Sequence, residues 1–279
     1  MAARFVVVPE WQGSPSSRAM RLIDGAEAIR GDLPSGATRV VEVPLGAGDS
    51  LGTAVHRASV VATVRERLVD TLSATVDGAT PIVVGGDCGV ELGAVDHALG
   101  RSPGMALVWF DAHGDLNTPE SSPSGAFCGM VLRALLGDGA DGLTPELPIG
   151  ADRVVLAGTR TLDDAEAAYI GNEGVPVVVA DRIAEDLAAA VDGLDVDDVY
   201  VHVDLDVLDP GEFGGVIDPQ PFGATVADLT AGIAAATAGR RLAGAGITMF
   251  APAAPATAID DLPPILRILS ALTAATRHR

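Results

Sequence analysis

The chain has 279 residues, of which 48% are hydrophobic and 4% aromatic, and it carries a formal net charge of −20 at pH 7. All of its basic residues are Arg, since no Lys occurs. A surface this acidic repels phosphate backbones and anionic lipids, so we expect no nucleic-acid partner and no membrane partner. The same field would attract a small cationic substrate.

The sequence contains no apolar run that approaches the roughly 20 residues needed to span a bilayer. The apolar stretch before Pro9 is too short for the core of a signal peptide. Two cysteines in a chain of this length do not make a disulfide scaffold. We therefore expect a cytoplasmic protein.

Short runs rich in Val, Ile and Leu alternate with Ala-rich helical patterns along the whole chain. The predicted strands are residues 5–9, 38–44, 80–86, 105–112, 153–159, 175–180, 198–206 and 242–250. The predicted helices are residues 54–77, 89–99, 126–137, 163–173, 182–192, 225–239 and 261–276. This alternation predicts one α/β domain over residues 1–279 with a parallel sheet of about eight strands.

Three long loops, residues 116–126, 209–225 and 251–264, follow predicted strands. They leave the carboxyl ends of those strands, which is where open parallel sheets bind ligands. Long loops inside a compact domain are usually functional. We therefore expect a site at this edge of the sheet.

The fourth predicted strand runs into VWFDAHGDLN. Asp111, His113 and Asp115 alternate in this stretch, so an extended chain places them on one face. Grouping two carboxylates with an imidazole costs free energy unless a cation neutralises them. A divalent metal ion is the simplest interpretation, and an ordinary polar loop at a strand end is the alternative.

The seventh predicted strand contains VHVDLDVLDP, where His202, Asp204 and Asp206 again share one face. Carboxylates separated by one residue repel each other unless an ion or a proton lies between them. Asp209, just before a proline, fits a turn better than a ligand. His202 lies one step deeper and is interpreted as a core histidine with one hydrogen bond, with support of a ligand as the alternative.

Together the two strand ends offer four carboxylates and one imidazole. Oxygen-rich donor sets suit hard divalent ions such as Mn²⁺ or Mg²⁺. This number of carboxylates is high for one ion, so it favours two metal ions that share bridging carboxylates.

Three motifs, GGDC (85–88), DAHGDLNTP (111–119) and DLDVLDP (204–210), resemble in order and spacing those of the ureohydrolase superfamily, the arginase and agmatinase family. The resemblance covers essentially the whole chain. It implies an αβα sandwich around an eight-stranded parallel sheet, two Mn²⁺ ions per chain and a homo-oligomer such as a trimer or hexamer. The metal ligands that it implies are Cys88 and Asp115 for the first site, His113 and Asp206 for the second, and Asp111 and Asp204 as bridges.

The chemistry that the resemblance implies is attack of a metal-bridging hydroxide on a guanidinium carbon, after which Asp115 passes a proton to the departing amine. Residues at matching places would bind an amino-acid-like substrate. They are Asn117, Ser122 and Ser124 for an α-carboxylate, and Asp163 and Glu166, in TRTLDDAE (159–166), for an α-amino group. Without the resemblance, Asp163 is equally well explained as a carboxylate in the first turn of a helix.

Three positions depart from the family pattern. Cys88 replaces a His ligand, and a thiolate prefers Zn, Fe or Co over Mn. The start of a helix at this point should lower the pKa of the Cys88 thiol, whereas a small buried hydrophobic residue is the alternative interpretation. Met249, in GITMFAP (246–252), replaces a Glu that clamps the guanidinium, which favours a less basic head group such as N-hydroxyguanidine.

Cys128, in SGAFCGM (124–130), replaces the His that serves as a proton shuttle. A thiol can transfer protons, although its reference pKa of about 8.5 is poorly matched to neutral pH. A disulfide between Cys88 and Cys128 is conceivable, but a reducing cytosol disfavours it.

The leading hypothesis is therefore a metal-dependent hydrolase that cleaves a C–N bond of a guanidino group on an amino-acid-like substrate. Arginine, agmatine and N-hydroxyarginine are the candidates. The alternative is a catalytically degenerate ureohydrolase fold with a binding or structural role, which the three replacements motivate. Nucleotide binding is a weaker hypothesis, because GGDCGVELG is not the GxGxxG motif and the chain has no Lys.

Overall fold

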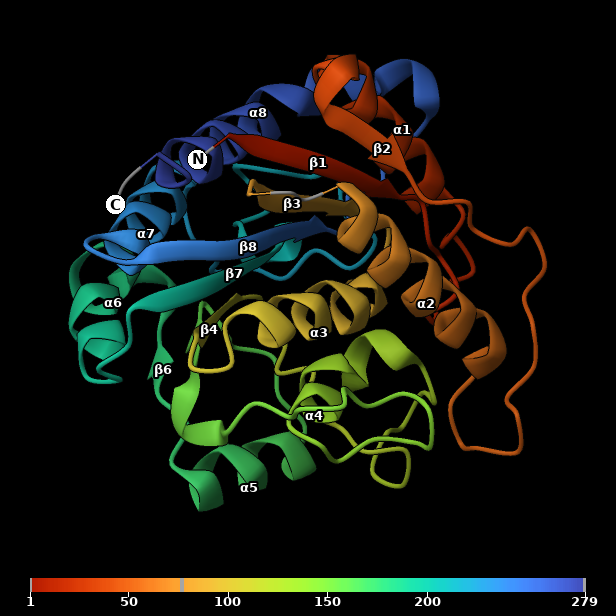
Figure 1. Cartoon of the computed structure of the whole chain (residues 1–279), viewed down its shortest axis with the longest axis horizontal. Helices are drawn as coiled ribbons and strands as arrows, with labels where there is room; N and C mark the ends of the chain where they lie inside the picture. Colours follow the sequence, from red (N-terminus) through yellow and green to blue (C-terminus); the bar gives the residue numbers. More distant parts are fainter. Residues whose placement is uncertain (1, 76–77, 278–279) are drawn as a thin grey trace.

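The computed structural model describes residues 2–75 and 78–277 of the chain. Within them, eight strands form one sheet in which all neighbouring strands are parallel (Figure 1). The strands are β1 (Ala3–Val8), β2 (Thr38–Val40), β3 (Thr80–Gly85), β4 (Ala106–Phe110), β5 (Val154–Ala157), β6 (Val177–Val178), β7 (Asp198–Asp204) and β8 (Arg241–Thr248). Their spatial order is β2-β1-β3-β8-β7-β4-β5-β6. The predicted α/β fold with a parallel eight-stranded sheet is confirmed.

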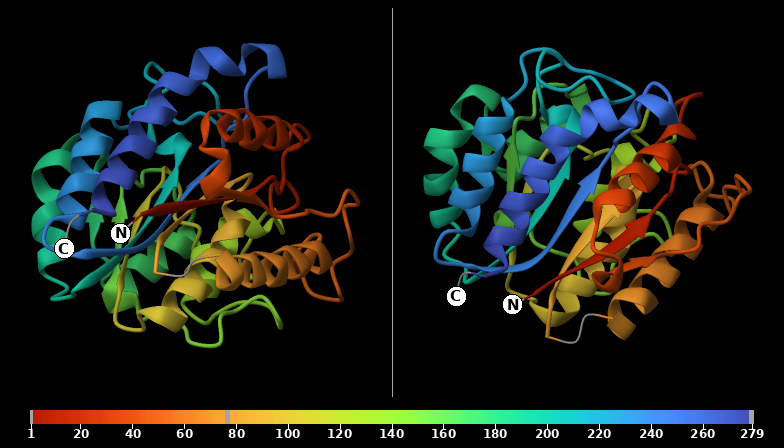
Figure 2. Two further views of the ribbon diagram at one scale, coloured as in Figure 1. Left: turned by 45° about the horizontal axis from the view of Figure 1, so that its top comes forward. Right: turned by 90° about the horizontal axis from the view of Figure 1, so that it is seen from above.

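Helices cover both faces of the sheet (Figure 2). They are α1 (Arg21–Asp32), α2 (Ala58–Thr75), α3 (Glu91–Arg101), α4 (Val131–Leu135), α5 (Asp164–Glu173), α6 (Ile183–Asp192), α7 (Val226–Thr237) and α8 (Ala258–Ala275). One buried apolar cluster joins α2, α3 and α4 to the sheet, and a second joins α6, α7 and α8 to the other face. These layers are the αβα sandwich that the family resemblance implies. None of the helices in the described residues is long and apolar enough to cross a lipid bilayer.

Several element boundaries differ from the prediction. The sequence pattern does not predict α1, which contains two glycines. Gly25 lets α1 pack tightly, because a Cβ atom there would lie 1.9 Å from the carbonyl oxygen of Phe250. The helix predicted over 126–137 is α-helical only from Val131 to Leu135, after a 3-10 turn. The helix predicted over 54–77 begins at Ala58, and residues 76–77 lie outside the described residues.

The register of the central strands places the predicted site residues next to one another. Phe110 at the end of β4 pairs with Val203 of β7, so Asp111 leaves the sheet beside Asp204. Asp204 in turn pairs with Thr248 of β8. Because β3 also adjoins β8, the turn after β3 reaches the same edge of the sheet.

The segment after β1 crosses the end of β3 at very short range. The amide of Gly86 donates to the carbonyl oxygen of Val8 at 2.9 Å, and that of Asp87 donates to Glu10 at 3.1 Å. A Cβ atom on Gly86 would lie 1.6 Å from the Glu10 carbonyl oxygen. Only glycine therefore permits this crossing, which carries Ser14 to the edge of the sheet.

We predict that Gly86→Ala lowers the free energy of unfolding by about 1–3 kcal/mol, because the added methyl group meets backbone atoms that cannot move aside. Gly100→Ala is the matched control. It lies near the end of α3 with no atom within 4 Å of an added Cβ, so it should stabilise the protein by about 0.5–1 kcal/mol. Urea unfolding of both variants checks this, and equal stability of the two would contradict it.

Candidate metal centre and adjoining cavity

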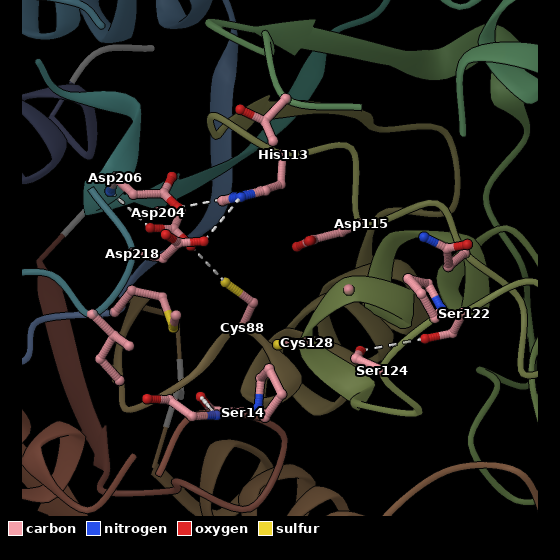
Figure 3. Close-up of a pocket in the computed structure, with 18 of the residues that line it drawn as sticks. Ser14, Cys88, His113, Asp115, Ser122, Ser124, Cys128, Asp204, Asp206 and Asp218 are labelled. Carbon is pink, nitrogen blue, oxygen red and sulfur yellow. Dashed lines mark hydrogen bonds and ion pairs between the residues drawn. The ribbon is translucent and has the colours of Figure 1, made fainter. Parts of the chain in front are cut away.

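A cavity of about 580 Å³ opens at the carboxyl ends of the central strands (Figure 3). Eleven of the predicted site residues line it: Cys88, His113, Asp115, Asn117, Ser122, Ser124, Cys128, Asp163, Glu166, Asp204 and Asp206. Asp111 is fully buried beneath this wall. The structure thus brings the residues of all three motifs to one place.

One group of metal-ligating atoms is formed by Asp111, His113 and Asp206, which lie within 4.8 Å of one another. The His113 Nδ1 atom is 2.9 Å from Asp206 Oδ2 and 3.5 Å from Asp111 Oδ1. Burial lowers the pKa of His113, but the hydrogen bonds to these two carboxylates outweigh it and raise the pKa to about 12. Without a metal ion, a proton on His113 offsets their charge.

Tight turns, rather than strand alternation, present these side chains. Strand β7 ends at Asp204, and residues Leu205–Val207 form a 3-10 turn in which the Asp206 amide donates to Asp204 Oδ1 at 2.8 Å. Strand β4 ends at Phe110, and Asp115 has a left-handed backbone with φ of 52°. The expectation that each triplet follows one extended strand is therefore wrong in this detail, although the residues still converge.

A second group of metal-ligating atoms is formed by Cys88, Asp111 and His202, again within 4.8 Å of one another. The Cys88 thiol donates to Asp204 Oδ2 at 3.1 Å and lies 3.2 Å from Thr248 Oγ1. Burial, and then the charge of Asp204, raises the pKa of this thiol well above its ordinary value. The lowering expected from the start of a helix is overturned, because desolvation and nearby carboxylates dominate.

His202 is completely buried, and both ring nitrogens face ionisable groups. Its Nδ1 atom lies 3.1 Å from Glu91 Oε1, which is the single hydrogen bond that the sequence interpretation allowed. Its Nε2 atom lies 3.8 Å from Asp111 Oδ2 and 3.9 Å from Cys88 Sγ. The ring stacks on Trp109, with 3.7 Å between centroids.

Asp115 carries the least satisfied carboxylate of the cavity wall. It is buried, and its Oδ2 atom has no hydrogen-bond partner among the described residues. Burial, followed by the charge of Asp111, raises its pKa well above the ordinary value. In Figure 3 its carboxylate points across the cavity toward the side of Cys88 and Asp204.

Asp163 and Glu166, two acidic residues of the cavity wall, belong to one hydrogen-bond network. Asp163 is the N-cap of α5, and its Oδ1 atom accepts from the amides of Ala165 and Glu166. Its Oδ2 atom accepts from Asn117 Nδ2 at 2.7 Å. Glu166 accepts from the amides of Asp163 and Leu116, both at 3.1 Å. Asp163 therefore caps a helix, in line with the structural interpretation, and it also lines the cavity.

Two serine hydroxyls stand near the outer part of the cavity. Ser122 Oγ accepts from the amide of Gly125, and Ser124 Oγ accepts from that of Ala126. The two oxygens are 3.5 Å apart. This separation allows one hydroxyl to donate to the other. The second hydroxyl then keeps its proton for a ligand on the cavity side.

The two residues that replace the expected shuttle and clamp also line the cavity. Cys128 is half-buried, and burial, followed by Asp87, raises the pKa of its thiol well above the ordinary value. Cys88 and Cys128 are both free thiols, so the conceivable disulfide is not formed. Met249 is buried and has a left-handed backbone with φ of 66°.

Sequence reasoning missed several residues that line the cavity or lie behind its wall. Ser14 and Arg18 come from the segment before α1, and Arg18 Nη2 donates to the carbonyl oxygen of Ile217 at 3.1 Å. Asp218 Oδ2 lies 3.8 Å from His113 Nε2. It belongs to the loop 209–225 that was expected to be functional, but nothing in the loop's sequence distinguishes it. Glu91 could have been noticed as an acid inside an apolar helix.

Arg160 fixes the course of that loop. Its guanidinium donates five hydrogen bonds to backbone carbonyl oxygens, those of Gly158, Asp206, Val207, Gln220 and Pro221. Two acceptors belong to the turn that presents Asp206, two belong to the far end of the loop, and Gly158 follows β5. Asp209 holds the same loop by accepting from the amides of Gly211 and Gly223, as its interpretation as a turn residue predicts.

The family model of the Arginase family matches residues 19–260 of this chain. The arginase of Bacillus caldovelox is 34% identical over 230 residues, which make up 76% of this chain and 75% of that protein. The arginase of Bacillus subtilis strain 168 is 36% identical over 156 residues, half of each chain.

Solved structures agree in fold. An arginase of Entamoeba histolytica in complex with L-ornithine has a TM-score of 0.83 at 22% identity, with 99% of this chain and 97% of that chain covered. A putative agmatinase from Clostridium difficile has a TM-score of 0.73 at 17% identity, covering 99% and 96%. These identities support likeness of fold alone. The sequence matches go further, since they extend over most of the chain and include its three motifs, and they show that it belongs to the arginase family of hydrolases.

Proposed function

We propose that the chain is a metal-dependent hydrolase that cleaves a C–N bond of a guanidino or related group on an amino-acid-like substrate. Arginine, agmatine and N-hydroxyarginine are the candidate substrates. The observation that carries this proposal is the convergence of the carboxylates after β4 and β7 with Cys88 on the wall of one cavity. An acidic cavity of this kind is suited to a cationic group.

The donor set fits two divalent cations. Asp111, Asp115, Asp204 and Asp206 are all buried together, and Asp115 Oδ2 has no partner among the described residues. Such a cluster of like charges is unfavourable without positive charge beside it. The oxygen-rich group around His113 suits Mn²⁺, and Cys88 alters the other site. When bound, the metal ions would supply Lewis acidity toward the substrate and an activated water molecule.

We propose that Asp115 moves the proton needed for C–N cleavage. Its Oδ2 atom has no hydrogen-bond partner among the described residues, and its carboxylate faces the cavity. It can therefore donate to the nitrogen that departs. The raised pKa of Cys128 keeps its thiol protonated, so this residue serves as a hydrogen-bond donor rather than as a base.

The outer cavity supports recognition of an amino acid. The hydroxyls of Ser122 and Ser124 are suited to an α-carboxylate, together with Asn117. The carboxylates of Asp163 and Glu166 are suited to an α-amino group. At the inner end, Met249 supplies no countercharge, which favours a head group less basic than guanidinium, such as N-hydroxyguanidine.

A catalytically degenerate protein with a binding or structural role is the second candidate, favoured by Cys88, Cys128 and Met249 at the three replaced positions. The hydrolase proposal is preferred, because a binding or structural role does not require four buried carboxylates.

We further propose that residues 1–279 act as one domain in the cytoplasm and assemble as a homo-oligomer. One continuous sheet supports a single domain. Two free thiols support a location in the cytoplasm, and the family resemblance supports the homo-oligomer.

The proposed activity is tested by loading the metal-free protein with Mn²⁺ and measuring urea or hydroxyurea released from arginine, agmatine and N-hydroxyarginine. We expect release from at least one of them, with N-hydroxyarginine favoured over arginine. Asp115→Asn is the control, which should lower kcat by at least about 100-fold through loss of proton transfer. Metal-loaded, folded protein that releases neither product from any of the three would refute the proposal.

Because the carboxylate cluster needs a cation, Asp204→Asn should affect the melting temperature in opposite directions with and without metal. In metal-free protein, removal of one buried charge should raise the melting temperature or leave it unchanged. Added Mn²⁺ should stabilise the wild type but not the variant, because a shared ligand is lost. Thermal unfolding with and without chelator measures both effects. If Mn²⁺ raises the melting temperature of both proteins by the same amount, that result would contradict a ligand role for Asp204.

The same cluster predicts a pH dependence of stability. Burial raises the pKa of Asp115, Asp204 and Asp206 in the folded, metal-free protein. The folded state therefore binds more protons than the unfolded state, whose carboxyl groups titrate near pH 4. Stability should fall as the pH rises from about 4 through the folded pKa values. Urea unfolding between pH 5 and 8 in chelator should show this slope, and Asp204→Asn should flatten it.

A further inference from the structure

We infer that His202 is itself a metal ligand. With Cys88 and Asp111 it would form a nitrogen–sulfur–oxygen site that selects Zn²⁺ or Co²⁺ over Mn²⁺. This inference rests on the proposed metal-dependent function and deepens it. It assigns one of the two metal positions to a different kind of ion and gives a role to a residue that the three motifs leave without one.

The spacing of the three donor atoms matches a metal site. The His202 Nε2 atom lies 3.8 Å from Asp111 Oδ2 and 3.9 Å from Cys88 Sγ, and all three atoms lie within 4.8 Å of one another. Ligand atoms held about 2.0–2.3 Å from a tetrahedral ion are roughly 3.3–3.7 Å apart. The two distances from His202 Nε2 exceed this range by only a few tenths of an ångström, and the Cys88–Asp111 separation is below 4.8 Å.

The two ring nitrogens of His202 are paired unequally, although the ring is completely buried. A good N–H···O hydrogen bond is about 2.9–3.0 Å long, whereas Nε2 has only a long contact with Cys88 Sγ at 3.9 Å and with Asp111 Oδ2 at 3.8 Å. Nδ1, in contrast, is well paired with Glu91 at 3.1 Å. One ring nitrogen is therefore held by a hydrogen bond. The other faces a carboxylate and a thiol at distances close to those between two ligands of one metal ion.

The surroundings of His202 fix the tautomer that a ligand needs. The Glu91 carboxylate accepts from the Tyr200 hydroxyl at 2.6 Å and faces Nδ1, which places the ring proton on Nδ1. The lone pair of Nε2 then points toward Asp111 and Cys88. A carboxylate behind a histidine in this way is the usual support of a metal-ligating imidazole. Trp109 holds the ring from one side by stacking and donates from Nε1 to Asp111 Oδ2 at 3.2 Å.

The chemistry of the donors decides which ion is preferred. Thiolate and imidazole are softer ligands than carboxylates and favour Zn²⁺ or Co²⁺. Cys88, Asp111 and His202 are all at most 2% exposed, so water competes poorly for the ion. The other group, built on His113 and Asp206, contains no sulfur and keeps its preference for Mn²⁺. The centre would accordingly hold two different metals.

The test is NMR of ¹⁵N-histidine-labelled protein, stripped of metal and given one equivalent of ¹¹³Cd²⁺, a spin-active substitute for Zn²⁺. We expect a one-bond cadmium–nitrogen coupling to His202 Nε2, and a cadmium shift typical of a thiolate ligand. His202→Gln should abolish the coupling, and Cys88→Ser should move the cadmium shift. His56→Gln is the matched control, because His56 is exposed and does not line the cavity, and it should change neither signal.

If His202→Gln does not fold, the wild-type coupling is assigned through His113→Asn, which removes the histidine that lines the cavity. A coupling that survives in His113→Asn and His56→Gln supports His202. No coupling to His202 in folded, cadmium-bound wild type overturns the inference, even when the Mn²⁺-loaded protein releases urea. Conversely, a coupling to His202 without urea or hydroxyurea release from any substrate would reject the proposed activity and leave the site standing.

Discussion

Mutual repulsion among four buried carboxylates is the constraint around which this molecule is built. Asp111, Asp115, Asp204 and Asp206 come from turns that follow two adjacent strands, and a parallel register brings those turns together. An antiparallel pairing would send the two carboxyl ends to opposite edges of the sheet. The fold thus concentrates negative charge at one edge of the sheet. Backbone amides donate to Asp111, Asp204 and Asp206, but the balancing charge has to come from a bound species or from protons.

The two sides of this cluster balance that charge differently. On the side of His113, an imidazole forms hydrogen bonds with two carboxylates and takes up a proton when no cation is present. On the side of Cys88, the thiol donates to Asp204, and the Nε2 atom of His202 on β7 lies 3.9 Å from the same sulfur atom. The replacement of the expected histidine by Cys88 therefore does not leave this side without a ring nitrogen, because β7, which β8 separates from β3, supplies His202.

The sequence predicted the strands and the convergence of the acidic residues that follow them, because both leave local patterns. Central strands are continuous apolar runs, and candidate ligands such as Asp111 and His113 recur at fixed short spacings after them. Contacts between distant parts of the chain leave no such pattern. Glu91 and His202 are 111 residues apart and meet only through the packing of α3 on the sheet. The pKa of Cys88 was misjudged for a related reason, since the carboxylates that dominate it arrive from other strands.

The way Arg160 holds the loop 209–225 has a consequence for how this protein could change over time. All five of its hydrogen bonds end on backbone carbonyl oxygens, which every residue type possesses. The route of the loop is therefore largely independent of the side chains that it displays to the cavity, including Ile217 and Asp218. Mutations in this loop can alter the recognised molecule while the turn that presents Asp206 stays in place. The residues that select the bound molecule can thus change without changes in the turn that presents Asp206, because Arg160 holds both segments through their backbones.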